Sequence, residues 1–156
     1  MRTIGRAITF GILGLLAAAA EARADSPDEL AERMRKATAV LSEMASGTRD
    51  TDIPREVLAK ARAVAVSPQV KKGAVIVGGR HDQGVMSVKR VSDGRWSAPA
   101  FFEGANVQPD GTAVRTLYGA KADSRDVLLG GRYAVPTSAR AFVSVLTTYS
   151  PPPKRP

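Results

Sequence analysis

The sequence predicts an α+β fold in which N-terminal helices pack on a mostly antiparallel, glycine-rich β-sheet or partial barrel. Residues 26–61 repeat apolar side chains at helical spacing, whereas residues 70–102 contain short apolar and β-branched runs separated by glycine turns. Helices that are followed by successive short strands are typical of this class. The 156-residue chain has no cysteine, so side-chain packing must hold the fold without disulfide bonds.

The first predicted helix begins at Ser26. The run Ser26-Pro27-Asp28-Glu29 combines an N-cap, a proline at the first helical position and a glutamate three residues after the cap, which together form a capping box. Apolar residues then recur at steps of three and four, at Leu30, Met34, Ala37, Leu41 and Met44. This stripe is more typical of a core face than of a partner-binding face. Gly47 is the expected end of the helix.

A second, shorter helix is predicted after a polar linker. Pro54 suits its first helical position, and Val57, Leu58 and Ala61 are expected to face inward. The pattern then changes to alternating alanine and valine, so Val64–Val66 is predicted to be a strand that leaves this helix.

The centre of the chain, residues 70–102, is predicted to form two or three strands. Ala74–Val77 is a short apolar run, and Val85–Val91 has the β-branched content of a strand. Ser92-Asp93-Gly94 is a turn sequence, since Asp tolerates turns and Gly supplies a positive φ. Arg95–Ser97 is expected to begin the return strand.

The last third, residues 105–156, carries seven Lys and Arg residues against three Asp and Glu. Val127–Leu129 is predicted to be a short strand, and Ala141–Tyr149 is either a strand or a helix, because its periodicity does not decide. The prolines after residue 150 predict a disordered end.

Residues 1–24 have the pattern of a secretory signal peptide. Arg2 and Arg6 give a basic start, Ala7–Ala20 is apolar, and Ala22-Arg23-Ala24 predicts cleavage after Ala24. An uncleaved N-terminal anchor is the alternative, although the apolar run is short for a membrane span. The protein is therefore expected to be periplasmic or secreted. With a formal net charge of +8, it would meet anionic membrane surfaces before nucleic acid.

Basic residues cluster in the predicted sheet and are opposed only by Asp82 and Asp93. This candidate headgroup-binding set consists of Lys71, Lys72, Arg80, Lys89, Arg90 and Arg95. An ordinary solvated surface is the alternative interpretation of such a cluster. Trp96 is either a membrane-interface residue or a residue packed against the sheet.

The sequence predicts neither catalysis nor a cofactor. His81 is the only histidine and there is no cysteine, whereas zinc and iron sites draw on several such ligands. His81-Asp82 could form a base and its orienting carboxylate, but adjacent residues in a turn rarely face each other, and no nucleophile motif accompanies them. Aromatic residues make up 5% of the chain, too few to predict stacking on nucleic-acid bases.

Short segments between about residue 37 and residue 102 carry a family resemblance. They are Ala39-Val40-Leu41, Ile53-Pro54, Val57-Leu58, Ala61, Ala63-Val64-Ala65-Val66-Ser67-Pro68, Lys72-Gly73, Val77-Gly78-Gly79-Arg80, Gly84-Val85 and Trp96-Ser97-Ala98-Pro99-Ala100-Phe101. In this order and spacing they resemble the lipid-binding SYLF domain family, which includes yeast actin regulators. The resemblance implies a non-catalytic α+β domain that binds acidic phospholipids and is exported in bacterial members.

Two departures from the family pattern affect the expected organisation. Asp82 stands where the family has a glycine, and the match stops after residue 104, so the chain resembles a truncated or divergent member. We therefore expect a SYLF-like part over residues 25–104, a divergent basic segment over residues 105–156, and a sheet with an exposed edge.

Together these observations predict an exported module that associates with acidic phospholipid headgroups through a basic sheet surface. The alternative is an envelope protein that binds a protein partner through its helix face or sheet edge. A buried apolar stripe on the first helix would favour the lipid-binding function, and an exposed stripe would favour the alternative.

Overall fold

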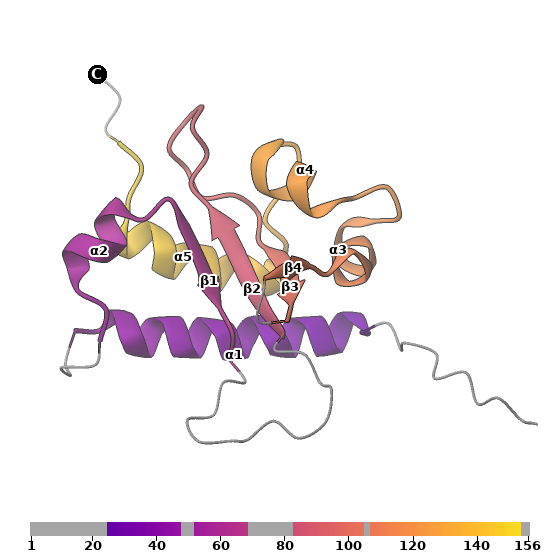
Figure 1. Ribbon diagram of the computed structural model, residues 1–156, viewed down its shortest axis with the longest axis horizontal. Helices are drawn as coiled ribbons and strands as arrows, with labels where there is room; N and C mark the ends of the chain where they lie inside the picture. Colours follow the sequence, from indigo (N-terminus) through magenta and orange to yellow (C-terminus); the bar gives the residue numbers. More distant parts are fainter. Residues whose placement is uncertain (1–24, 48–51, 69–82, 105–106, 154–156) are drawn as a thin grey trace, which may run out of the picture.

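The computed structural model describes residues 25–47, 52–68, 83–104 and 107–153, and these ranges form an α+β fold, as predicted (Figure 1). The elements in order are α1 (Pro27–Ala45), α2 (Arg55–Lys60), β1 (Ala63–Val66), β2 (Gln83–Val88), β3 (Ala100–Glu103), β4 (Gln108–Pro109), α3 (Gly111–Tyr118), α4 (Ser124–Leu129), the 3-10 turn η1 (Thr137–Ala139) and α5 (Arg140–Tyr149). Within these ranges, none of the helices has the length and apolar content required to cross a bilayer.

The four described strands form one antiparallel sheet in the order β1-β2-β3-β4. The sheet is open and does not close into a barrel. In β2, Gly84 lies opposite Phe102, and a Cβ atom at this position would be 2.6 Å from the carbonyl oxygen of Val66. The glycine therefore allows β1 and the Phe102 ring to approach the centre of the sheet closely.

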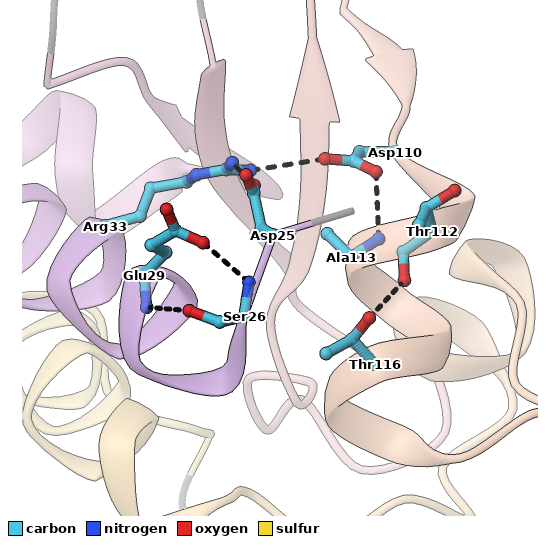
Figure 2. A network of polar contacts seen from close by, with 8 residues as sticks. All are labelled: Asp25, Ser26, Glu29, Arg33, Asp110, Thr112, Ala113 and Thr116. Carbon is cyan, nitrogen blue, oxygen red and sulfur yellow. Dashed lines mark hydrogen bonds and ion pairs between the residues drawn. The ribbon is translucent and has the colours of Figure 1, made fainter. Parts of the chain in front are cut away.

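Helix α1 begins with the capping box that the sequence predicts (Figure 2). The Glu29 N–H donates to Ser26 Oγ at 3.3 Å, and the Ser26 N–H donates to Glu29 Oε2 at 2.7 Å. The predicted stripe is buried except for Met44, which is 38% exposed. The four-residue step from Leu41 leads instead to Ala45, which is fully buried at the helix end, two residues before Gly47.

A buried arginine joins α1 to the second half of the chain (Figure 2). Arg33 lies within the apolar stripe of α1 and is only 5% exposed. Its guanidinium pairs with Asp25 and, at 3.3 Å, with Asp110 Oδ2. The same guanidinium stacks 5.4 Å from the centre of the Phe101 ring in β3. A charge at this depth is stable only when it is paired in this way.

Helix α2 confirms the second predicted helix, with two differences. Pro54 is the N-cap and not the first helical residue. Leu58 is buried as predicted, whereas Val57 is 57% exposed. Neighbouring residues of a helix point in directions about 100° apart, so Val57 and Leu58 cannot both face the core, and α2 buries Leu58. Strand β1 follows and confirms the strand predicted at Val64–Val66.

The strand predicted at Val127–Leu129 is wrong, because these residues end helix α4. Asp123 caps this helix by accepting a hydrogen bond from the Asp126 N–H at 2.8 Å. This cap fixes the first turn, and tertiary packing of Val127 overrides the β preference of a short apolar run.

The undecided segment near residue 145 is helix α5, which lies alongside α1 (Figure 1). Phe142 and Leu146, one helical turn apart, are both buried in the same core as Leu30, Val85 and Phe101. The basic C-terminal third therefore completes the core that the N-terminal part begins.

The polypeptide after α5 begins with a buried serine and continues with exposed prolines, one of which touches the hairpin turn. Ser150 is 2% exposed, and a Cβ placed on Gly94 would lie 2.3 Å from Pro153 Cδ. Pro151, Pro152 and Pro153 are exposed and form no regular secondary structure, so the predicted disordered end stays a prediction. Composition alone does not show the contacts of Ser150 and Pro153, because their partners are distant in sequence.

We expect Arg33→Met to destabilise the protein by about 3 kcal/mol, because it leaves two carboxylates without their shared partner in a largely buried site. Chemical denaturation measures this change. Arg35→Met on the same helix is the control, since Arg35 is 74% exposed and its ion pair with Glu32 lies at the surface. Equal stability of the two variants would contradict the structural role of Arg33.

Phe142→Ala should cost about 4 kcal/mol of unfolding free energy, because the ring is fully buried and its removal leaves a cavity. The exposed Arg140 on the same helix provides the control variant Arg140→Ala, which should change stability by less than about 0.5 kcal/mol. A small effect of Phe142→Ala would show that α5 is not part of the core.

Candidate functional site

The candidate site is built on the hairpin between β2 and β3. Lys89 pairs with Trp96, and the Ser97 N–H donates to the Val88 carbonyl at 2.8 Å, so the predicted return strand pairs locally with the end of β2. The turn lies at the predicted position, with Gly94 at φ +64° and its N–H donating to the Arg90 carbonyl at 2.9 Å. Glycine adopts this left-handed conformation without a steric cost.

The carboxylate of Asp93 organises the turn. It accepts hydrogen bonds from Arg90 Nε at 3.1 Å, from Arg90 Nη2 at 2.5 Å and from the Arg95 N–H at 3.0 Å. The Arg90 side chain, and then the Arg95 N–H, lower the pKa of Asp93, so the carboxylate stays ionised. The charge of Arg90 is therefore largely compensated within the turn.

Arg95 differs from Arg90 in its surroundings. Its side chain is exposed, and it has no ion pair among the residues that the structure describes. An arginine of this kind presents its full fork of donors to an outside anion.

Both arginines line a pocket of about 370 Å³ beside the hairpin. The walls come from the hairpin, from the loop after α4, from α5 and from the C-terminal segment; they are Arg90, Arg95, Trp96, Ala98, Tyr133, Val135, Val143, Thr147 and Pro152. The volume lies within the range of ligand pockets, which are mostly apolar with a few polar groups that orient the ligand. The pocket thus combines two guanidinium groups with apolar walls.

Two tyrosines hold the wall that faces the hairpin. The ring of Tyr133 meets the ring of Tyr118 edge to face, with centroids 5.6 Å apart. The Tyr118 hydroxyl donates to the Pro99 carbonyl at 2.6 Å, which ties α3 to the chain just before β3. These contacts place Tyr133 at the pocket and fix its ring by packing.

Trp96 is buried in the core and contributes one face to the pocket lining. It is 5% exposed, and its indole Nε1–H donates to the Ser150 carbonyl at 3.0 Å. Of the two interpretations of this residue, the structure supports sheet packing. The satisfied N–H explains how the large ring can be buried.

Lys89 does not line the pocket, although it contacts Trp96, which does. Its ammonium donates to Ser150 Oγ at 2.6 Å and lies 5.4 Å from the centre of the Trp96 ring. Burial, and then the nearby charge of Arg62, lower the pKa of Lys89. This ammonium therefore joins the hairpin to the C-terminal segment and is not directed at the pocket.

The predicted headgroup-binding residues thus separate into groups. Arg90 and Arg95 come together with Trp96 around the pocket, and Lys89 does not. Lys71, Lys72, Arg80 and His81 lie outside the described residues. The sequence interpretation missed the C-terminal wall, including Tyr133, Val143 and Thr147. The sequence signal for this wall was the four-residue spacing of Phe142 and Leu146, which is typical of a helix. In such a helix, Val143 and Thr147 lie together on the adjacent face.

Comparisons with protein-family models, with curated proteins and with solved structures found no match to this chain. Inferences about its function therefore start from the pocket and from the sequence itself.

The contribution of Tyr118 to stability should fall as the pH rises above about 10, because burial raises the pKa of Tyr118 well above its ordinary value. The unfolded chain releases this proton near its ordinary pKa while the folded chain keeps it, so the loss reaches about 1.4 kcal/mol per pH unit. Chemical denaturation of wild type and Tyr118→Phe from about pH 9 to about pH 11, which brackets the ordinary tyrosine pKa, measures how the free energy of unfolding of each protein changes with pH.

Tyr118→Phe should lose this component of the alkaline fall, at the cost of the hydrogen bond to Pro99. Tyr149→Phe is the matched control and should keep it, because Tyr118 is still present. The same alkaline fall in wild type and in Tyr118→Phe would show that the phenol is not buried as the structure describes.

Proposed function

We propose that the protein is an exported, non-catalytic lipid-binding module that associates with acidic phospholipid headgroups. The observation that carries this proposal is the exposed Arg95, which forms no ion pair in the described ranges, although its charge acts on the nearby Asp93, and which stands beside an apolar-walled pocket. The predicted signal peptide, the formal charge of +8 (+6 once residues 1–24, with three Arg and one Glu, are removed) and the resemblance of residues 37–102 to the SYLF family support the same function.

The proposed contact is a charge-assisted hydrogen bond between the Arg95 guanidinium and a headgroup phosphate. Guanidinium groups match phosphate oxygens with two parallel donors, and a basic residue near an acidic bilayer contributes about 1 kcal/mol. Arg90 lines the same pocket but is already bonded to Asp93, so it contributes less of its charge. Lys71, Lys72 and Arg80 stay candidate headgroup ligands from the sequence.

The protein-partner alternative has less support. It needs either an exposed apolar face on α1 or a sheet edge. On α1, Leu30, Met34 and Leu41 are at most 2% exposed and belong to the protein's own core. The edges of the described sheet are the short strands β1 and β4. Neither feature selects a protein partner.

Flotation with vesicles tests the proposed function. The protein should float with phosphatidylcholine vesicles that contain phosphatidylglycerol, float much less with pure phosphatidylcholine, and dissociate as salt is added. Arg95→Gln should weaken binding about fivefold, which corresponds to the loss of about 1 kcal/mol at a charged surface.

The control is Arg35→Gln, which removes the same charge from an exposed position on α1. In Figure 1 this helix lies on the opposite side of the molecule from the hairpin tip. Equal binding to acidic and neutral vesicles would contradict the proposal, and equal weakening by both substitutions would remove Arg95 from the site.

A further inference from the structure

The pocket at Arg95 is longer than a headgroup contact needs. It shares Val135, Val143 and Thr147 with an adjoining hollow of about 380 Å³ that continues along α5. The second hollow is also lined by Arg140, Ser144 and Thr148. The two hollows are therefore continuous along the outer face of α5, the first more enclosed and the second shallow and open to solvent. Together we call them the α5 groove.

The chemistry of the α5 groove changes along its length. Arg90 and Arg95 lie at the hairpin end, whereas the walls next to them are apolar side chains such as Ala98, Val135 and Val143. In the pocket itself, the arginines are the cationic partners of a phosphate or carboxylate, because valine and alanine side chains offer no hydrogen bond. The second hollow adds the polar side chains of Arg140, Ser144 and Thr148. Methylene groups that leave water for such walls are stabilised in proportion to the apolar area that they bury.

We propose that the α5 groove binds the single acyl chain of an anionic amphiphile, whose carboxylate or phosphate is held by Arg95. This inference rests on the proposed function and deepens it, because the ligand is then a lipid monomer with its tail inside the protein and not only a bilayer surface. A fatty acid and a lysophospholipid share the required chemistry, which is one tail and one anionic head.

The charge pattern selects this occupant over others. A neutral apolar ligand would use none of the hydrogen-bond donors of Arg95, and a small polyanion would leave the valine walls in contact with water. The C-terminal segment adds to the enclosure, because Pro152 forms part of the wall and Pro153 lies against Gly94 in the turn. An anionic head followed by an apolar chain satisfies both parts of the groove.

The chain carries its own reporter for this ligand. Trp96 is the only tryptophan of the chain and lines the pocket, so its fluorescence reports directly on a quenching atom that enters the pocket. Bromine quenches indole fluorescence only at close range. Stearate brominated at mid-chain, titrated below the concentration at which it forms micelles, should quench Trp96 saturably, and plain stearate should displace it.

Two comparisons separate the head from the tail. Arg95→Gln should weaken the binding of the brominated stearate about fivefold, the change expected for one lost charge contact of about 1 kcal/mol. A brominated alcohol of the same chain length should bind more weakly than the acid and should not respond to Arg95→Gln. A lysophosphatidic acid with a brominated chain tests the phosphate head in the same way.

Val143→Phe tests the groove itself, because the larger ring occupies the space of the tail. It should reduce quenching at least tenfold, while Val57→Phe, a matched enlargement on the exposed side of α2, should leave quenching unchanged. Far-ultraviolet circular dichroism checks that both variants fold. If Val143→Phe does not fold, the comparison of the acid with the alcohol in wild type decides the same question.

The outcomes distinguish this inference from the proposed function. Vesicle binding without quenching by the brominated stearate would overturn the acyl-chain site and leave headgroup association in place. Saturable quenching without vesicle flotation would support the site and overturn association with the bilayer. Quenching that is linear in lipid concentration, or equal for acid and alcohol, would also overturn the inference.

Discussion

The buried ion pair between Arg33 and Asp110 is the constraint on which the rest of the structure depends. Asp110 accepts from Arg33 through one carboxylate oxygen and caps α3 through the other, at 2.9 Å from the Ala113 N–H. Its own N–H donates to the Phe101 carbonyl at 3.0 Å. One side-chain pair therefore fixes the first helix, strand β3 and the start of the C-terminal helices relative to each other. The Arg33 guanidinium can be buried away from water only because the carboxylates that pair with it are both in place.

The pocket is a consequence of that arrangement. Helix α3 leads from Asp110 to Tyr118, which positions Tyr133, and α5 brings Val143 and Thr147 to the hairpin. Ser150, just after α5, joins the C-terminal segment to α2 and to the hairpin. Its hydroxyl donates to the Ala59 carbonyl at 3.0 Å and accepts from Lys89, and its carbonyl accepts from Trp96. Residues that are distant in sequence thus form one concave surface around Arg95.

The parts of this fold that depend on neighbouring residues could be predicted from the sequence. The capping box at Ser26 and the turn at Asp93-Gly94 are local, and the helical stripe that includes Leu30 and Leu41 follows from spacing alone. The short apolar run in α4 has no such signature, and its helix depends on a cap and on tertiary packing. The roles of the basic residues were also hidden, because composition cannot show that Arg90 is bonded to Asp93 or that Lys89 is bonded to Ser150. Arg33 interrupts an apolar stripe, and only its two distant carboxylates explain it.

The central claim is that an anionic lipid binds between the hairpin and α5. Nuclear magnetic resonance of the uniformly ¹⁵N-labelled protein, titrated with short-chain phosphatidylglycerol below its micelle concentration, locates the ligand residue by residue. The structure predicts that amide shifts concentrate at Arg95, Trp96, Val135, Val143 and Thr147 and approach saturation. Shifts that are absent from these amides, or that concentrate instead on the exposed face of α1, would contradict it.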